Sequence, residues 1–144
     1  MSKAELWQTD KANYPFATVT QTRFGDMDVL GHINNVSMAD LFENGRVRFN
    51  RSLELENRAS DERWLIAAIQ INYVREAHFP NDVEIASGIG RIGRSSWDIY
   101  SAAFQKGECV ATCITTLVLT DKNGSKPMAE QFAKALNQHL VQRS

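Results

Sequence analysis

Apolar residues along this chain change their spacing near residue 34, and the change separates two kinds of secondary structure. From residue 34 to about residue 50 they recur at helical spacing, which predicts one long helix. Asn34 or Asn35 is able to cap its start, and arginines gathered near its end suit the helix dipole. Because the apolar positions spread over more than one side, we expect the surrounding structure to wrap this helix.

Four extended segments follow a polar connection at residues 54–61. They cover residues 64–76, 83–92, 95–105 and 109–120, and short turn signals separate them. Strand alternation is visible at Ala67, Ile69, Ile71 and Tyr73. Since short turns join antiparallel neighbours, these segments predict a meander of long strands, and residues 16–24 add a shorter strand-like run.

The end of the chain predicts a second helix, beginning at Pro127, whose apolar stripe is formed by Met128, Phe132, Leu136 and Leu140. A long apolar helix beside a twisted sheet has few compact solutions, because the sheet has to curl around the helix to bury it. The fold class is therefore α+β, with an N-terminal tail at residues 1–13 and a single domain at residues 14–144. The outer face and the edge strands of such a sheet predict a homo-oligomer.

Composition narrows the function classes. The 144 residues carry 16 Lys and Arg against 17 Asp and Glu, a formal charge of −1, which offers no general attraction to nucleic acid or to anionic lipid. No apolar run reaches the length of a membrane span, and residues 1–14 lack a secretory signal, so we expect a cytoplasmic setting. Cys109 and Cys113 lie too far apart along a strand for a disulfide and are expected to be buried; neither they nor the scattered histidines predict a metal site.

The segment from Arg23 to Asn35 contains most of the candidate chemistry. Its aspartates, glycines, histidine and asparagines run directly into the start of the long helix, where free backbone N–H groups point outward. A carboxylate held beside such a helix end is able to act as nucleophile or general base while the amides stabilise an oxyanion. This combination suits attack on an acyl carbonyl, although the same aspartates also suit a simple turn.

Three runs carry a family resemblance: residues 24–35 with 41–46, residues 73–85, and residues 92–97. In this order, over about residues 14–128, they resemble the 4-hydroxybenzoyl-CoA thioesterase family of hotdog-fold acyl-CoA thioesterases. The resemblance implies a curved antiparallel sheet around one long helix. It also implies hydrolysis of an acyl-CoA to free acid and CoA, at an active site on the interface of a homodimer or of a homotetramer built from dimers.

The resemblance implies roles for particular residues. Asp28 matches the catalytic carboxylate, acting as nucleophile or general base, and Asp26 would be structural. The backbone N–H of Asn35 matches the group that polarises the thioester carbonyl. Glu43 is a second candidate, because related enzymes place the carboxylate on the helix, and His32 is either an orienting residue or an ordinary loop histidine.

The same resemblance places coenzyme A, as part of the substrate, near the turn at Gly93, where guanidinium and hydroxyl groups are available for its phosphates in Arg91, Arg94, Ser95 and Ser96. No metal or redox cofactor is implied. Two alternatives stay open: a non-catalytic hotdog module that binds an acyl group or acyl-CoA, and a thioesterase acting on acyl carrier protein. Leu30 stands where plant-type enzymes of the latter kind have an asparagine.

Overall fold

The computed structural model describes residues 3–55 and 61–143. Its helices are α1 (Asn35–Ser52) and α2 (Glu130–Asn137), together with the 3-10 turns η1 (Leu6–Thr9), η2 (Lys11–Asn13) and η3 (Phe24–Asp26). Its strands are β1 (Phe16–Thr20), β2 (Arg63–Tyr73), β3 (Val83–Ile92), β4 (Ser96–Gln105), β5 (Glu108–Asp121) and the short β6 (Gly124–Ser125). The long helix and the four long strands therefore lie where the sequence predicts them.

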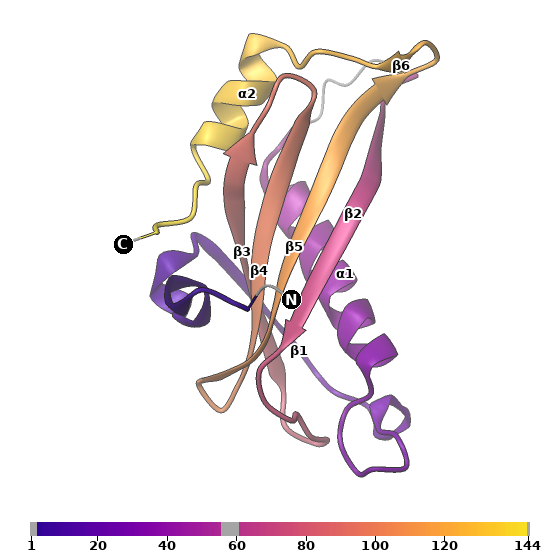
Figure 1. The fold of residues 1–144 in the computed structure, drawn as a ribbon, viewed down its shortest axis with the longest axis vertical. Coiled ribbons are helices and arrows are strands. Elements are labelled where there is room, and N and C mark those ends of the chain that lie inside the picture. The colour runs from indigo at the N-terminus through magenta and orange to yellow at the C-terminus, as the bar shows by residue number, and fades with distance from the viewer. Residues whose placement is uncertain (1–2, 56–60, 144) are drawn as a thin grey trace.

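The strands form one antiparallel sheet in the order β1-β3-β4-β5-β2, with β6 paired to the end of β5. The expected meander is right for β3, β4 and β5 but wrong for β2, which pairs with β5 instead of β3. Residues 74–82 carry the chain past the ends of β4 and β5, so β2 becomes an edge strand. The sheet curls around α1, as Figure 1 shows.

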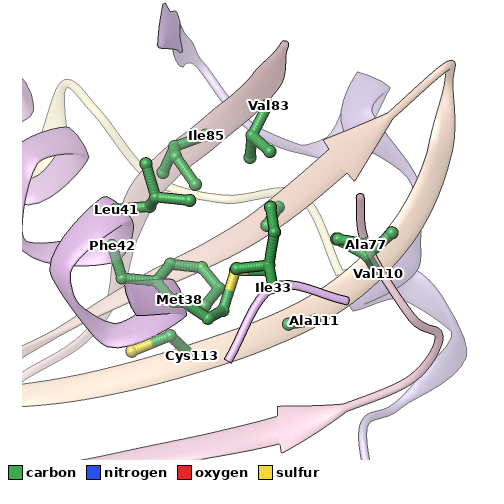
Figure 2. Close-up of a cluster of buried hydrophobic side chains, with 11 residues drawn as sticks. Ile33, Met38, Leu41, Phe42, Ala77, Val83, Ile85, Val110, Ala111 and Cys113 are labelled. Atoms are coloured by element: carbon green, nitrogen blue, oxygen red, sulfur yellow. The ribbon is translucent and has the colours of Figure 1, made fainter. Parts of the chain in front are cut away.

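The helix α1 lies on the concave face of the sheet over an apolar core. Figure 2 shows Ile33, Met38 and Phe42 pointing into a cluster with Ala111 and Cys113 of β5. At Gly45 the helix approaches β3 so closely that a Cβ atom placed there would lie 2.5 Å from Cγ2 of Ile85. Only a residue without a side chain allows this approach.

As predicted, the curved sheet wraps α1, and within one chain it covers one side of this helix (Figure 1). Its buried apolar residues, Met38, Leu41, Phe42 and Phe49, share one side. Val36 and Val47, on the other side, are 71% and 51% exposed. Because the sheet of one chain covers only that side of the helix, the apolar residues on the other side stay exposed.

The helix α2 covers the end of the concave face where β3 and β5 finish, at the top of Figure 1. Phe132 and Leu136 of the predicted stripe are buried against Trp97, whereas Leu140 lies beyond the helix and is 43% exposed. The helix begins at Glu130, so Pro127 precedes it instead of beginning it. Its C-terminal extension continues the sheet edge, because Ile89 N–H donates to the His139 carbonyl at 2.8 Å.

The convex face is partly covered by the N-terminal turns. Trp7 and Tyr14 pack there against Tyr100 and Phe104. Cys109 belongs to the same cluster, and both cysteines are free and buried, as predicted. Among the described residues, no helix has the length and apolar character needed to cross a membrane.

Candidate active site

The loop before α1 is held by backbone and carboxylate hydrogen bonds around Asp26. This residue is 4% exposed, and its carboxylate accepts from the Arg23 backbone N–H at 2.8 Å and from the Arg23 guanidinium at 3.2 Å. The Asp26 carbonyl accepts the N–H of Asn34 at 3.0 Å. Asp26 therefore ties the two ends of the loop together, and the carboxylate that remains available is that of Asp28.

Asp28 lies in a tight turn that the sequence encodes locally. Its N–H donates to the His32 carbonyl at 3.0 Å, and its own carbonyl accepts from Gly31 at 3.1 Å. Gly31 has φ +86°, a value that favours glycine. Oδ1 of Asp28 accepts the N–H of Leu30 at 2.9 Å. The turn therefore holds the carboxylate through one of its two oxygens.

The start of α1 supplies backbone donors beside this carboxylate. Asn34 is the N-cap, and its Oδ1 accepts the N–H of Ser37 at 2.9 Å. The Asn34 carbonyl accepts the N–H of Met38 at 3.0 Å. The amides of Asn35 and Val36 precede any intrahelical partner, and among the described residues no hydrogen bond takes either of them.

Asp28, His32 and Asn35 open onto the same cavity. It has a volume of about 420 Å³, and its walls come from the loop, the first turn of α1 and the end of β2 with the residues that follow it. Ile33 anchors the loop to that last segment, because its N–H donates to the Ala77 carbonyl at 2.7 Å. A carboxylate, the free amide of Asn35 and an apolar floor thus meet in one concave site, an arrangement that suits acyl transfer.

Two histidines lie on either side of the Glu76 carboxylate, and of these residues His32 and Glu76 line the cavity. Nε2 of His32 and Nε2 of His78 each lie 3.9 Å from an oxygen of Glu76. Nδ1 of His78 is 3.2 Å from the Gly31 carbonyl. His32 therefore faces Glu76, in the segment that follows β2.

Glu43 lies in a different place from Asp28. It lines a separate cavity of about 480 Å³ between α1, β1 and the loop, and its side chain is 64% exposed. Its nearest cation is Arg46, at 4.0 Å. Arg46 is buried and donates to the Thr115 hydroxyl at 3.3 Å, so it belongs to the contact between helix and sheet. Within one chain the structure thus separates the two candidate carboxylates.

The four residues suggested for coenzyme A lie around the turn between β3 and β4, at the opposite end of the sheet from the start of α1 (Figure 1). Arg91 is engaged there by Asp98, with both guanidinium contacts at 3.1 Å, and by the Ser96 hydroxyl at 3.1 Å. Arg94 is exposed, and Ser95 accepts the N–H of Leu119 through its carbonyl. The structure therefore does not bring these residues to Asp28 of the same chain.

Sequence reasoning missed Tyr73 and Glu76 as walls of the site. Tyr73 is the last residue of β2, and its hydroxyl donates to the Asn35 carbonyl at 3.1 Å. Burial, with the Cys113 thiol nearby, raises the pKa of Tyr73. The alternation of β2 already placed Tyr73 on the same side as Ile71, but only the curl of the sheet brings that side to the helix start. Among residues 3–55 and 61–143, no His, Cys, Asp and Glu side chains gather into a metal-binding group.

A curled antiparallel sheet around one central helix is the hotdog fold (Figure 1). The chain belongs to the thioesterase-like superfamily, whose model matches residues 22–136. This confirms the family resemblance seen in the sequence, and with it the fold.

Solved structures agree with this assignment. A predicted thioesterase from Bacillus stearothermophilus superposes with a TM-score of 0.80 at 27% identity, covering 90% of this chain and 98% of that one. A thioesterase from Thermus thermophilus, complexed with coenzyme A and Zn, has a TM-score of 0.77 at 24% identity, covering 88% and 95%. The uncharacterized protein YsmA of Bacillus subtilis (strain 168) is 24% identical over 124 residues, which are 85% of this chain and 84% of that protein.

Proposed function

We propose that this protein hydrolyses an acyl-CoA thioester to a free acid and CoA. The observation that carries the proposal is the single cavity shared by Asp28 and the Asn35 amide. The membership of the chain in the thioesterase-like superfamily supports it, as does the coenzyme A complex of the Thermus thermophilus relative.

In the proposed reaction the thioester carbonyl carbon lies beside Asp28 and its oxygen beside the Asn35 N–H. Asp28 either removes a proton from water as the new C–O bond forms, or attacks the carbonyl itself to give an anhydride that water then opens. The C–S bond breaks in both routes, and the proton reaches the leaving thiolate. The helix amide stabilises the negative charge that develops on the carbonyl oxygen. Water is the only co-reactant that this chemistry needs.

The proposed working unit is a pair of chains joined through β2. This strand pairs with β5 on one side only, and one of its faces is apolar while the other carries Gln70 and Asn72. Leu65 and Ile66 face opposite sides of the sheet and are 53% and 45% exposed. Ile69, further along the same edge strand, is also exposed. An exposed apolar edge strand is a template for pairing, and a second copy of β2 satisfies it with two-fold symmetry.

The test compares thiol release from short, medium, long and aromatic acyl-CoAs by wild type, Asp28→Asn and Glu43→Gln. Both substitutions remove one carboxylate and keep its shape, so each serves as the control for the other. We expect Asp28→Asn to lose a factor of about 10² or more in kcat and Glu43→Gln to stay near wild type. Full activity in Asp28→Asn would rule out its role, and loss in Glu43→Gln alone would move the catalytic carboxylate to α1.

The competing outcome is binding without turnover. If wild type releases no thiol from any member of the panel but binds the non-hydrolysable thioether analogues of the same acyl-CoAs, the protein is an acyl-CoA-binding module. Release from acyl carrier protein but not from CoA esters would instead identify the carrier-protein thioesterase.

A further inference from the structure

The hydroxyl of Tyr73 contacts the first peptide group of α1 from across the cavity. Its Oη lies 3.1 Å from the Asn35 carbonyl oxygen, and the two residues line the same cavity as Asp28. Tyr73 ends β2, 38 positions from Asn35 in the sequence. The contact therefore joins the edge strand to the helix end where the oxyanion would form.

The first turn of α1 leaves two amides for a ligand. The N-cap residue Asn34 takes the N–H groups of Ser37 and Met38, through its side chain and its carbonyl respectively. Asn35 and Val36 are left, and both lie in the first turn, where N–H groups point outward along the helix axis; of the two residues, Asn35 lines the cavity. One of them is the donor already assigned to the thioester oxygen.

The Asn35 carbonyl and the Val36 N–H belong to one peptide group. A hydrogen bond accepted by the carbonyl polarises that group and makes its N–H a stronger donor. The same bond fixes the plane of the peptide, so that the N–H keeps its direction when charge develops on the substrate. Preorganised donors of this kind stabilise an oxyanion without reorganising during the reaction.

We propose that the Val36 amide is a second oxyanion donor and that Tyr73 is the positioning residue that aligns it. This inference rests on the proposed thioesterase function and adds a residue from β2 to its site. Tyr73 acts as a donor throughout the neutral range, because a phenol with an ordinary pKa of about 10 is protonated there. It touches the helix peptide and not the reacting atoms.

The test is Tyr73→Phe, which removes the hydroxyl and keeps the ring that packs at the end of β2. The matched control is Tyr100→Phe, on the convex face, where the ring packs against Trp7 and beneath Arg143. We expect Tyr73→Phe to lower kcat about three- to tenfold with KM unchanged, which is the range that one hydrogen bond supports. Tyr100→Phe is expected to keep both constants.

Two further measurements separate positioning from a merely structural role. Elution on size exclusion and the urea midpoint of Tyr73→Phe should match wild type, because the apolar contacts of the ring persist. In spectra of the labelled protein, the amide proton of Val36 should move upfield in Tyr73→Phe, since its peptide group loses polarisation.

Each outcome decides the matter. A wild-type kcat in Tyr73→Phe overturns the inference and leaves the thioesterase proposal intact. A loss of kcat accompanied by a changed KM, elution or midpoint assigns Tyr73 a structural role and also overturns it. If wild type turns over no member of the acyl-CoA panel, the proposed function fails and this inference fails with it.

Discussion

Replacing Gly45 by alanine tests how closely α1 is seated on the sheet. The added Cβ would lie 2.5 Å from Cγ2 and 2.8 Å from Cβ of Ile85, and the second of these atoms is fixed to the backbone of β3. Because the neighbour cannot rotate away, we place the overpacking cost at the upper end of its usual range, about 3 kcal/mol. Alanine regains about 1 kcal/mol of helix propensity. The net loss of stability is then about 2 kcal/mol.

Urea denaturation at a fixed protein concentration measures this loss. With a denaturant slope of about 2 kcal/mol/M, the midpoint of Gly45→Ala should fall by about 1 M. Gly25→Ala is the control, because a Cβ there meets nothing within 4 Å, and its midpoint should stay near wild type. Removing Cγ1 and Cγ2 with Ile85→Ala should make the Gly45→Ala step less costly than in wild type. A midpoint equal to or above wild type in Gly45→Ala would refute the close seating of the helix.

Two further predictions concern the N-cap and the thiols. Asn34→Ala removes the acceptor for the Ser37 N–H, so it should cost about 1 kcal/mol in urea denaturation and also lower kcat by loosening the first turn of α1. A midpoint and kcat both at wild type would contradict this. Burial raises the pKa of Cys109 and Cys113, so the native protein should resist a disulfide exchange reagent at mildly alkaline pH, whereas the denatured chain should react at both thiols. The thiol pKa values are higher in the folded than in the unfolded chain, so the protonated thiols favour the folded state. This stabilisation is complete below the unfolded pKa and is lost as pH rises toward the folded values. Rapid reaction of the native protein with the reagent would contradict the burial of the thiols.

The elements of the fold were predictable because each depends on local spacing. The long helix, expected at residues 34–50, is α1 at Asn35–Ser52, and its N-cap was one of the two residues named. The partner of β2 was not predictable in the same way. Alternation predicts a strand at residues 64–76, which the structure has at Arg63–Tyr73, but it carries no information on which neighbouring strand pairs with it. Short turns favour adjacent pairing, and the connection at residues 74–82 is long enough to carry the chain past two strands.

The residues of the candidate site also fall into two groups, those that a local motif predicts and those that depend on the fold. Asp28, His32 and Asn35 come from one continuous segment, so a motif was sufficient to bring them together, and the structure places them on one cavity. Tyr73 and Glu76 reach that cavity from the far end of β2, which depends on the curl of the whole sheet. Glu43 is close to the motif in sequence but on another side of α1, a distinction that follows from helix geometry only once the buried side is known.

Contacts to the phosphates of coenzyme A are expected to cross between the two chains of the proposed pair. In one chain Arg94 and Asp28 lie at opposite ends of the sheet, and β2 alone has 11 residues, which span about 35 Å at about 3.3 Å per residue. Two β2 strands that pair antiparallel about a two-fold axis place the Arg94 end of each chain beside the Asp28 end of the other. Arg94→Ala should then raise KM about tenfold with kcat unchanged, as expected for the loss of a charged contact to a phosphate.

Mixed dimers of an Asp28→Asn chain and an Arg94→Ala chain, separated by different tags, decide whether the site crosses the interface. If it does, one of the two sites combines the intact Asp28 of one chain with the intact Arg94 of the other, and the mixed dimer shows the wild-type KM at half the wild-type kcat. If each site uses residues of a single chain, no intact site exists, because the Asp28→Asn chain is inactive and the Arg94→Ala chain keeps its raised KM. A raised KM in the mixed dimer would therefore show that Arg94 serves the site of its own chain, and the expected crossing between the two chains would be refuted.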